Sequence, residues 1–445
     1  MDMQKRIYFG TDGIRGRVND AVINPEFFLK LGYVVGRILS ESSRTKKTVV
    51  IGRDTRISGE SLQAALTEGL VLTGVDVTDL GVLPTPAIAY FTKELKADIG
   101  VVISASHNPY EDNGVKFIGP DGMKLPDDWE GLVENNIKNI KNIPKNKSGS
   151  VKIISDIQEK YEQHCLDLFS DLNLKHYKLV LDCANGATSH IAEIIFKKLN
   201  AEIISMHNNP NGYNINDHCG ATDLKSLKEK VLATKADCGL AFDGDGDRLL
   251  MVDHLGETVD GDEILCILAL NQKTKSNVVG TLMSNLGLEL ALQKNNILFE
   301  RAAVGDRYVL EKMKEKNWSL GGEASGHIIN FNFSNSGDGI ITGLQVLQIL
   351  LNAKKDLNTL KKSMQKRPQI LINVKVENPK NFSDIPEILE AVKKSEKILN
   401  GSGRILLRAS GTESCVRVMV ECNEDAQAKQ IAGDLAKIVE RCFDA

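Results

Sequence analysis

The feature that most constrains this chain is the run at residues 242–248, which reads Phe-Asp-Gly-Asp-Gly-Asp-Arg. Three carboxylates this close repel one another, so the loop is costly unless a cation lies among them. The glycines let the backbone curl without a Cβ penalty, so the carboxylates can converge. Hard oxygen ligands suit Mg²⁺ or Ca²⁺, and around Mg²⁺ they leave positions for water or a phosphoryl oxygen. The run therefore predicts a divalent-cation site, with a polar Asp-Gly turn after a strand as the alternative.

An EF-hand calcium loop does not explain this run. That loop needs glycine at its sixth position and glutamate at its twelfth, where this chain has Arg248 and His254. The cation site is therefore expected to be a tight connection at the end of a strand.

Composition describes a soluble globular protein of several domains. At 445 residues the chain exceeds one ordinary core, so about three or four domains are expected. A net charge of −4 gives no electrostatic reason to expect nucleic acid or an anionic membrane as a partner. No apolar run reaches about 18 residues and the start is unlike a signal peptide. The eight cysteines include no Cys-x-x-Cys pair, so buried reduced thiols and a cytoplasmic location are expected.

Strand and helix patterns alternate through three blocks and change in a fourth. Such alternation favours mostly parallel sheets covered by helices, and the last block favours an α+β domain. We expect an α/β fold with three similar mixed-sheet domains at 1–150, 151–256 and 257–367, and a C-terminal α+β domain at 368–445, with a linker at 142–150. The predicted strands are 48–51, 98–103, 178–182, 202–205, 238–242, 277–283, 297–304, 370–376, 404–408 and 416–421. The predicted helices are 58–73, 262–272, 306–316 and 339–352, with others beginning near 187, 223 and 424.

A second chemical segment is Ile-Ser-Ala-Ser-His-Asn-Pro at 103–109, directly after a predicted strand. Functional groups in open α/β sheets lie beyond the carboxyl ends of strands, which makes Ser106 a candidate. The Gly-x-Ser-x-Gly elbow is absent, so acyl-transfer hydrolysis is disfavoured. The alternative is a structural serine turn before Pro109.

Three further segments suggest ligand binding. The run Gly-Gly-Glu-Ala-Ser-Gly-His at 321–327 suits a polyhydroxyl ligand, with His327 able to move protons near neutral pH, or is simply a flexible loop. The run Arg-Ala-Ser-Gly-Thr-Glu at 408–413, with Arg417 beyond it, could bind phosphate without a metal, or is a charged hairpin connection. In the opening run 9–16, Arg15 could reach a phosphoryl group.

Taken together, these segments resemble the α-D-phosphohexomutase superfamily over essentially the whole chain. The Ser-His-Asn-Pro, Asp-Gly-Asp-Gly-Asp-Arg, Gly-Glu-x-Ser-Gly-His and Arg-x-Ser-Gly-Thr-Glu signatures occur in family order. The opening run and Ser-Ala-Ser-His-Asn-Pro are similar to the bacterial branch acting on glucosamine phosphates. The resemblance implies four domains around a central cleft. It also implies phosphate exchange between O6 and O1 through a phosphoserine enzyme and glucosamine 1,6-bisphosphate, supplying amino-sugar nucleotide precursors for the cell envelope.

The resemblance implies specific roles for these residues. Ser106 would be the phosphoserine, and its phosphate would join the three aspartates around one Mg²⁺ per chain. Lys116 and His327 would be candidate proton-transfer groups, and Arg15 and Arg248 would balance charge. The aspartates of the metal site would be Asp243, Asp245 and Asp247. Sugar hydroxyls would bind Glu323 and Ser325, and the phosphate that is not transferred would bind Arg408, Ser410, Gly411, Thr412 and Arg417.

The implied partners are a small phosphosugar and an unknown kinase or bisphosphate that first charges Ser106. A homodimer is one assembly open to the chain, and neither nucleic acid nor membrane is expected. Alternatives are a phosphoglucomutase or phosphomannomutase, a metal-dependent phosphatase, and a cation-binding scaffold. The phosphatase signature Asp-x-Asp-x-Thr/Val fails because Asp247 stands at its last position. A scaffold leaves the sugar-type and phosphate-type runs unexplained.

Overall fold

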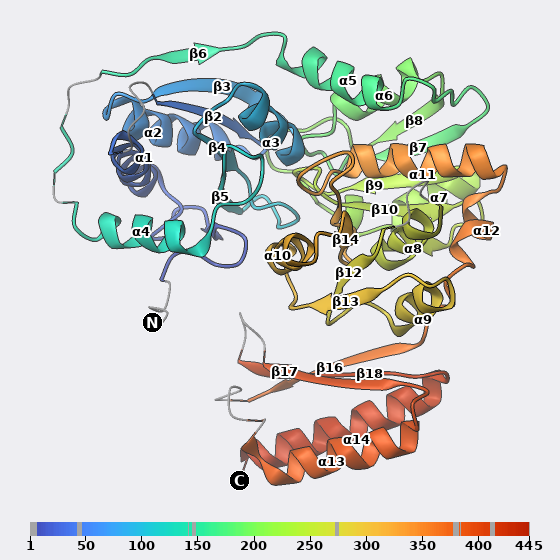
Figure 1. The fold of residues 1–445 in the computed structure, drawn as a ribbon. Helices are drawn as coiled ribbons and strands as arrows, with labels where there is room; N and C mark the ends of the chain where they lie inside the picture. Colours follow the sequence, from blue (N-terminus) through green and yellow to red (C-terminus); the bar gives the residue numbers. More distant parts are fainter. Residues whose placement is uncertain are drawn as a thin grey trace.

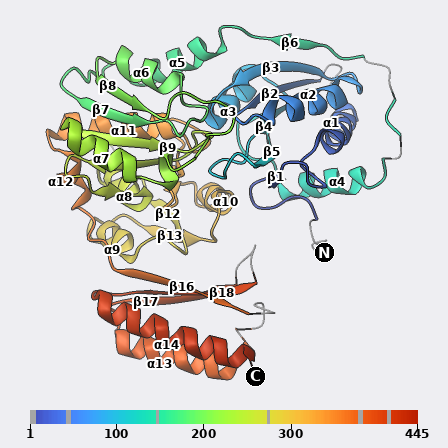
Figure 2. The ribbon, with the colours of Figure 1, turned by 180° about the vertical axis from the view of Figure 1, so that it is seen from behind.

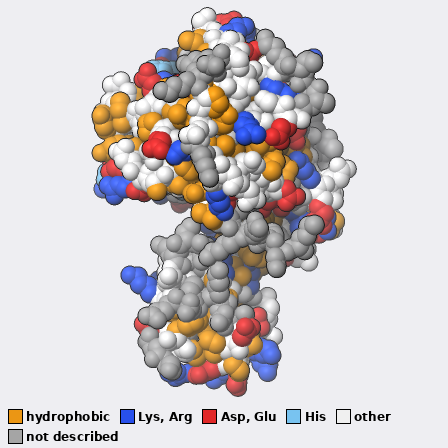
Figure 3. Space-filling model, turned by 90° about the vertical axis from the view of Figure 1, so that its left-hand side faces the viewer, with side chains coloured by type: hydrophobic (Ala, Val, Ile, Leu, Met, Phe, Trp, Pro, Cys, Tyr) orange, Lys and Arg blue, Asp and Glu red, His pale blue; other side chains and the backbone are white. Residues whose placement is uncertain are grey.

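The structure is a computed structural model that describes residues 7–41, 47–140, 142–144, 148–271, 276–376, 382, 384–409 and 414–444. Three sheets with their helices form one body, and a smaller sheet with two helices forms a lobe beneath it (Figure 1). The space-filling view in Figure 3 shows the same large body and smaller lobe. The expected fold class, three mixed-sheet α/β domains and a C-terminal α+β domain, is confirmed.

The first domain contains a six-stranded sheet whose inner strands are rich in β-branched residues. Strands β2, β3, β4 and β6 run parallel, β5 is antiparallel to β4, and β1 is antiparallel to β5. Strand β6 begins just beyond the predicted linker and pairs with β3, so this sheet takes a strand from past residue 150. In spatial order the strands are β1 (Ile14–Arg17), β5 (Asp112–Ile118), β4 (Ile99–Ile103), β2 (Thr48–Arg53), β3 (Asp76–Val82) and β6 (Val151–Ile153).

Helices cover both faces of this sheet because alternate strand residues point in opposite directions. Val49 and Ile51 of β2 belong to the same core cluster as α1, α2 and α4, whereas Val50 clusters with α3. Helix α1 begins after Asn24, whose side chain accepts the Phe27 N–H at 2.9 Å. The helices are α1 (Pro25–Ser40), α2 (Gly59–Val71), α3 (Thr85–Glu94) and α4 (Asp127–Ile137).

In the second domain, the aspartate run directly follows strand β9 of the sheet. Strand β9 ends at Phe242 and β10 returns antiparallel from Leu249, so the aspartates form the connection between them. The helices expected near 187 and 223 begin later, at Ile191 and Lys225. The strands, in spatial order, are β11 (Thr258–Val259), β10 (Leu249–Asp253), β9 (Cys238–Phe242), β7 (Lys178–Asp182) and β8 (Glu202–Met206). The helices are α5 (Ile157–Leu168), α6 (Ile191–Lys198), η1 (Gly220–Thr222) and α7 (Lys225–Thr234).

The third domain has a four-stranded sheet in which the Gly-Glu-Ala-Ser-Gly-His run connects β14 to the antiparallel β15. Helix α11 is capped by Asp338, which accepts the Ile341 N–H at 2.9 Å. The strands are β13 (Phe299–Ala302), β12 (Val278–Thr281), β14 (Leu320–Gly322) and β15 (Ile328–Asn330). The helices are α8 (Gly261–Asn271), α9 (Leu286–Lys294), α10 (Asp306–Lys316), α11 (Gly339–Ala353) and α12 (Leu357–Lys361).

The C-terminal domain is an antiparallel three-stranded sheet with two helices on one face. Figure 1 and Figure 2 both show these helices on the side turned away from the other domains. The predicted phosphate-binding residues Ser410, Gly411 and Thr412 lie outside the described residues. The elements are β16 (Gln369–Lys375), β18 (Cys415–Glu421), β17 (Arg404–Ala409), α13 (Pro386–Leu399) and α14 (Asp425–Asp444).

The buried apolar clusters distinguish the first three domains, which share one cluster besides clusters of their own, from the C-terminal domain. One cluster runs through the first three domains and joins Ile88, Phe242 and Leu344, while the C-terminal domain has a cluster of its own. All eight cysteines are unpaired thiols, and every one except Cys442 is buried. Within the described part of the chain, each helix is too short or too polar to span a bilayer.

Candidate active site

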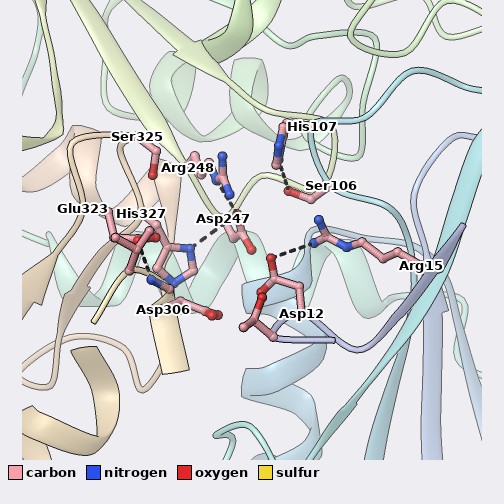
Figure 4. Close-up of a pocket in the computed structure, with 13 residues that line it drawn as sticks. Asp12, Arg15, Ser106, His107, Asp247, Arg248, Asp306, Glu323, Ser325 and His327 are labelled. Carbon is pink, nitrogen blue, oxygen red and sulfur yellow. Dashed lines mark hydrogen bonds and ion pairs between the residues drawn. The ribbon is translucent and has the colours of Figure 1, made fainter. Parts of the chain in front are cut away.

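A cavity of about 280 Å³ lies where the first three domains meet (Figure 4). Figure 4 shows Glu323, Ser325 and His327 on one side and Arg15 on the other. The sequence-predicted residues lining it are Arg15, Ser106, Asp247, Arg248, Glu323, Ser325 and His327. It is also lined by Thr11, Asp12, His107, Val304, Gly305 and Asp306, which sequence reasoning did not single out.

Ser106 lies just past the end of β4 with its hydroxyl directed at the aspartate run. Its Oγ donates a hydrogen bond to Asp243 Oδ2 at 2.8 Å and lies 3.3 Å from His107 Nδ1. The Ser106 backbone has φ of +52°, a left-handed conformation that is strained for a residue other than glycine. The fold therefore brings the predicted nucleophile and the predicted metal run together from two domains.

The three aspartates converge as the spacing predicts. One oxygen from each of Asp243, Asp245 and Asp247 lies within 4.8 Å of the others, and all three side chains are buried. Burial, with the neighbouring Asp247 and Asp245 charges, raises the pKa of Asp243 well above its usual range. Burial acts in the same direction on Asp247, but Lys116, His327 and Arg248 outweigh it and hold the pKa of Asp247 well below normal.

Lys116, on β5, places an ammonium beside this cluster. Its Nζ lies 2.6 Å from Asp245 Oδ2 and 3.2 Å from Asp247 Oδ2. Burial alone would lower the pKa of Lys116, yet the two carboxylates raise it above its ordinary value. Lys116 is therefore an ammonium at neutral pH.

The second oxygens of two aspartates fit a bound cation. Asp245 Oδ1 is buried and has no hydrogen-bond partner among the described residues. Asp247 Oδ1 is also buried without a hydrogen bond from this part of the chain, although it lies 3.5 Å from His327 Nδ1 and 3.9 Å from Arg248 Nε. Unsatisfied buried carboxylate oxygens are costly, and hard oxygens are the ligands that Mg²⁺ prefers. The residues present therefore fit one Mg²⁺ held by Asp243, Asp245 and Asp247.

A second trio, Asp182, His207 and Cys219, also clusters in the second domain. The Asp182 carboxylate already accepts the N–H groups of Ala184 and Gly220, each at 3.0 Å, and lies 3.0 Å from His207 Nδ1. Because its oxygens already have these partners, this trio is better explained as a junction between loops than as a metal site.

The two histidines that line the cavity differ in protonation at neutral pH. Burial tends to lower the pKa of His327, but Asp247, 3.5 Å away, raises it to about 9. Burial, together with Arg248 and Arg15, lowers the pKa of His107 to about 4. At neutral pH His327 can therefore donate a proton, whereas His107 is neutral.

Two guanidinium groups supply positive charge to the cavity. Arg248 Nε lies 3.9 Å from both Asp243 and Asp247, and the Arg248 N–H donates to Asp243 Oδ1 at 3.1 Å. Arg15 lies 3.5 Å from Asp12. Two fixed guanidinium groups facing one cavity suit a ligand with negatively charged oxygens.

The opposite wall offers groups that suit a sugar. Glu323 Oε1 accepts the Gly305 N–H at 3.1 Å, and burial raises the pKa of Glu323. Ser325 Oγ is buried and has no hydrogen-bond partner among the described residues. The wall therefore presents an acceptor and an unpaired hydroxyl to the cavity.

Arg408 and Arg417 lie in the C-terminal domain and do not line this cavity. They face each other across the β17–β18 pair. Burial, followed by the charge of Arg417, lowers the pKa of Arg408. Like charges directly opposite each other in a sheet are destabilising, so this arrangement is suited to an anion between them.

The cavity residues that the sequence analysis did not identify have only weak local signals in the sequence. Asp12 and His107 lie inside runs that were already singled out, next to Arg15 and Ser106. Asp306 is the first residue of α10, where an acidic side chain is ordinary, so its place in the cavity follows only from the fold.

The four parts of the chain match four models of the phosphoglucomutase/phosphomannomutase family. These are alpha/beta/alpha domain I at residues 6–144, domain II at 155–256, domain III at 260–367 and the C-terminal domain at 371–438.

Full-length relatives and solved structures agree with these matches. The chain is 51% identical to a phosphoglucosamine mutase of Coxiella burnetii, covering 99% of each chain. It is 50% identical to that of Pasteurella multocida, covering 98% of this chain and 99% of the relative. A phosphoglucomutase/phosphomannomutase family protein from Burkholderia thailandensis has the same fold, with a TM-score of 0.81, 24% identity and coverage of 98% and 97%. Aspergillus fumigatus N-acetylphosphoglucosamine mutase, solved with GlcNAc-6P and magnesium, matches with a TM-score of 0.71 and 18% identity. The match covers 99% of this chain and 96% of that one.

Proposed function

The chain belongs to the phosphoglucomutase/phosphomannomutase family, and from that membership we propose that it interconverts glucosamine 6-phosphate and glucosamine 1-phosphate. The relatives that are 51% and 50% identical over nearly the whole chain are named phosphoglucosamine mutase, which supports this sugar over glucose or mannose. The product would feed the formation of amino-sugar nucleotides for the cell envelope.

The observation that carries the proposal is the Ser106 hydroxyl, 2.8 Å from Asp243 and in the same cavity as Glu323, Ser325 and His327. A nucleophile, a cation site and a sugar-type wall within one cavity support phosphoryl transfer to a sugar better than any one of them alone.

The reaction would proceed in two transfers. Phosphorylated Ser106 gives its phosphoryl group to O1 of glucosamine 6-phosphate, which breaks the Ser106 Oγ–P bond and forms glucosamine 1,6-bisphosphate. The intermediate then reverses its orientation in the cavity, so that its 6-phosphoryl group can be transferred to Ser106. Glucosamine 1-phosphate is released and the phosphoenzyme is restored.

Protons would move through Lys116 and His327 in these transfers. Both carry a proton at neutral pH, as their raised pKa values indicate. A protonated group would act as the acid when Ser106 Oγ leaves the phosphoryl group, and after giving up that proton it would act as the base toward the Ser106 hydroxyl in the return transfer. Arg15 and Arg248 would hold phosphoryl oxygens in line between the two hydroxyls.

Family members generally use Mg²⁺, and Asp243, Asp245 and Asp247 would hold it here. When bound, it would neutralise charge on the phosphoryl oxygens. The phosphate that is not being transferred would rest against Arg408 and Arg417 of the C-terminal domain. One such binding site would have to accept either end of the bisphosphate.

Three further features belong to the proposal. Ser106 would first be phosphorylated by a kinase or by a sugar bisphosphate. The enzyme would act in the cytoplasm, and it could assemble as a homodimer. Intact-mass analysis after treatment with glucose 1,6-bisphosphate tests the charging route, because a phosphate should appear on Ser106.

Product analysis tests the function. Glucosamine 6-phosphate, glucose 6-phosphate and mannose 6-phosphate are each supplied with Mg²⁺, and 1-phosphates and free phosphate are measured. We expect kcat/KM for glucosamine 6-phosphate to exceed that for glucose 6-phosphate by about 100-fold. A site in which a group such as the Glu323 carboxylate pairs with the sugar ammonium rejects a sugar that lacks this ammonium. Equal values would assign the protein to the general hexose branch. Free phosphate as the main product would make it a phosphatase.

A further inference from the structure

The backbone that carries Ser106 is held in a conformation it would not adopt alone. Its left-handed φ of +52° persists only where surrounding contacts over-determine it. Ser104 Oγ accepts the Ser106 N–H at 2.8 Å, which fixes one side of the residue. The carbonyl side is held by two side chains outside the serine loop, defined here as residues 104–109.

The first of these side chains is the buried Arg56, from the loop after β2. Its Nη2 donates to the Ser106 carbonyl at 2.9 Å and to the Asn108 carbonyl at 2.8 Å. Its Nε pairs with Asp54 Oδ2 at 2.9 Å, and Asp54 also accepts the Ser104 hydroxyl at 2.6 Å. One planar guanidinium thus connects both ends of the strained turn, a geometry that a lysine ammonium cannot reproduce.

The second side chain is Asn216, which comes from the second domain. Its Nδ2 donates to the same two carbonyls, Ser106 O at 2.9 Å and Asn108 O at 3.0 Å. Gly244 of the aspartate run packs against this point, and a Cβ there would lie 2.6 Å from Ser106 O and 2.7 Å from Asn216 Nδ2. The serine loop is therefore held between donors from two domains, next to the loop that carries the metal ligands.

We infer that Arg56 and Asn216 are positioning residues, which fix the Ser106 carbonyl so that its hydroxyl meets the aspartate site in line for transfer. Neither side chain lines the cavity, so neither acts on the sugar. The inference rests on the proposed role of Ser106 as the nucleophile. Because Asn216 belongs to the second domain, it also ties the nucleophile to the metal-binding domain, and a small misplacement would slow transfer without weakening sugar binding.

The test compares Asn216→Ala with Asn214→Ala. Asn214 lies in the same loop and also makes two side-chain hydrogen bonds, to Asn209 O at 3.1 Å and from Asn211 N at 2.9 Å, but neither reaches the serine loop. We expect Asn216→Ala to lower kcat about tenfold with KM for the sugar phosphate within about twofold, whereas Asn214→Ala leaves both near wild type. Asn216→Asp should lower kcat further, since its carboxylate would face two carbonyl oxygens. Arg56→Lys keeps the charge beside Asp54 and should also lower kcat without raising KM.

A second measurement does not depend on turnover. Amide hydrogen exchange of the serine loop should become about tenfold faster in Asn216→Ala and stay unchanged in Asn214→Ala. Exchange and kcat equal in the two variants would overturn the inference, as would a rise in KM that accounts for the whole effect. If exchange responds as expected while wild type converts no phosphosugar, the anchoring stands and the proposed function fails.

Discussion

The junction between the first and second domains differs in kind from the junction that carries the C-terminal domain. At the first, Thr85 donates from its N–H and its hydroxyl to Asp245, at 2.8 and 2.6 Å, so the interface contacts a proposed metal ligand. At the second, Arg404 donates to the carbonyls of Leu282 and Ser284, both at 2.8 Å, and neither carbonyl belongs to a site residue.

The hydrophobic cores repeat this difference. One buried cluster runs through the first three domains, beside a second one confined to the first domain, whereas the cluster of the C-terminal domain includes no residue of another domain. Interfaces between domains that lack a shared apolar core allow relative motion by default. The comparison indicates that the proposed chemistry lies in a fixed body, while the arginines proposed to bind phosphate lie on a part that can shift to accept either end of an intermediate.

Removing the proposed nucleophile should have the largest effect and tests the body formed by the first three domains. Ser106→Ala should lower kcat by about 10⁴-fold or more, because it deletes the hydroxyl proposed to carry the phosphate. The Thr85 hydroxyl also reaches the aspartate run, but it donates to Asp245 at 2.6 Å and does not line the cavity. The melting temperature should change little, since the change deletes one oxygen and leaves the backbone contacts of Ser106 in place. Steady-state kinetics with intact-mass analysis check this, and a Ser106→Ala variant that retains full mutase activity would contradict the proposed mechanism.

Removing a proposed metal ligand should have the next largest effect. Asp245→Asn keeps the shape of the side chain but loses its charge, so Mg²⁺ affinity and kcat should both fall by about 100-fold. Titration calorimetry measures the affinity. The control is Asp182→Asn, in the trio assigned to loop packing, which should leave Mg²⁺ affinity unchanged even if stability falls. Chelator treatment should abolish turnover until Mg²⁺ is restored, and turnover in metal-free buffer would count against the site.

Substitutions in the C-terminal domain should change substrate binding (KM) more than the rate of the chemical step (kcat). Arg417→Ala should raise KM by about tenfold or more, on the order of 1.5–3 kcal/mol for a desolvated charge-assisted contact, with a much smaller change in kcat. Arg441→Ala, on the exposed surface of α14, is the control and should have no effect. An unchanged KM in Arg417→Ala would remove this arginine from the substrate site.

Loosening the tie between the third and fourth domains should have the smallest effect. Arg404→Ala deletes the contacts to Leu282 and Ser284, so the C-terminal domain would be less well oriented. It also removes an ion-pair partner of the buried Glu421 carboxylate, so the stability of this domain should fall as well. KM should rise by about two- to threefold, the scale of one or two partly exposed hydrogen bonds. A tenfold fall in kcat instead would mean that this interface belongs to the fixed body, and the comparison would fail.

The fold class and the segments that carry chemistry could be predicted because their signals are local. Three aspartates spaced by glycines define a site within five residues, and strand patterns such as 98–103 end where functional groups are expected. Helix α10 has the bounds predicted for it, 306–316. In each case the information lies within one short window of sequence.

What could not be predicted depends on contacts between distant residues. Arg56 and Asn216 are ordinary polar loop residues, and only the fold brings both to the Ser106 carbonyl. The pairing of β6 with β3 joins segments about 75 residues apart and leaves no local signature. Helix α6 begins four residues after Ala187 because a series of turns continues through residue 190. The domain boundaries and the roles of the site residues remain predictions.

The distribution of buried thiols gives this chain a natural set of probes. The first domain contains no cysteine, while Cys183, Cys238 and Cys266 are buried in the second and third and Cys422 in the C-terminal domain. A buried thiol reacts with a disulfide reagent only when its surroundings open. The order in which the cysteines become labelled under mild denaturant therefore reports which part of the molecule opens first. If the C-terminal lobe is as independent as its separate core indicates, Cys422 should be modified well before the thiols of the body.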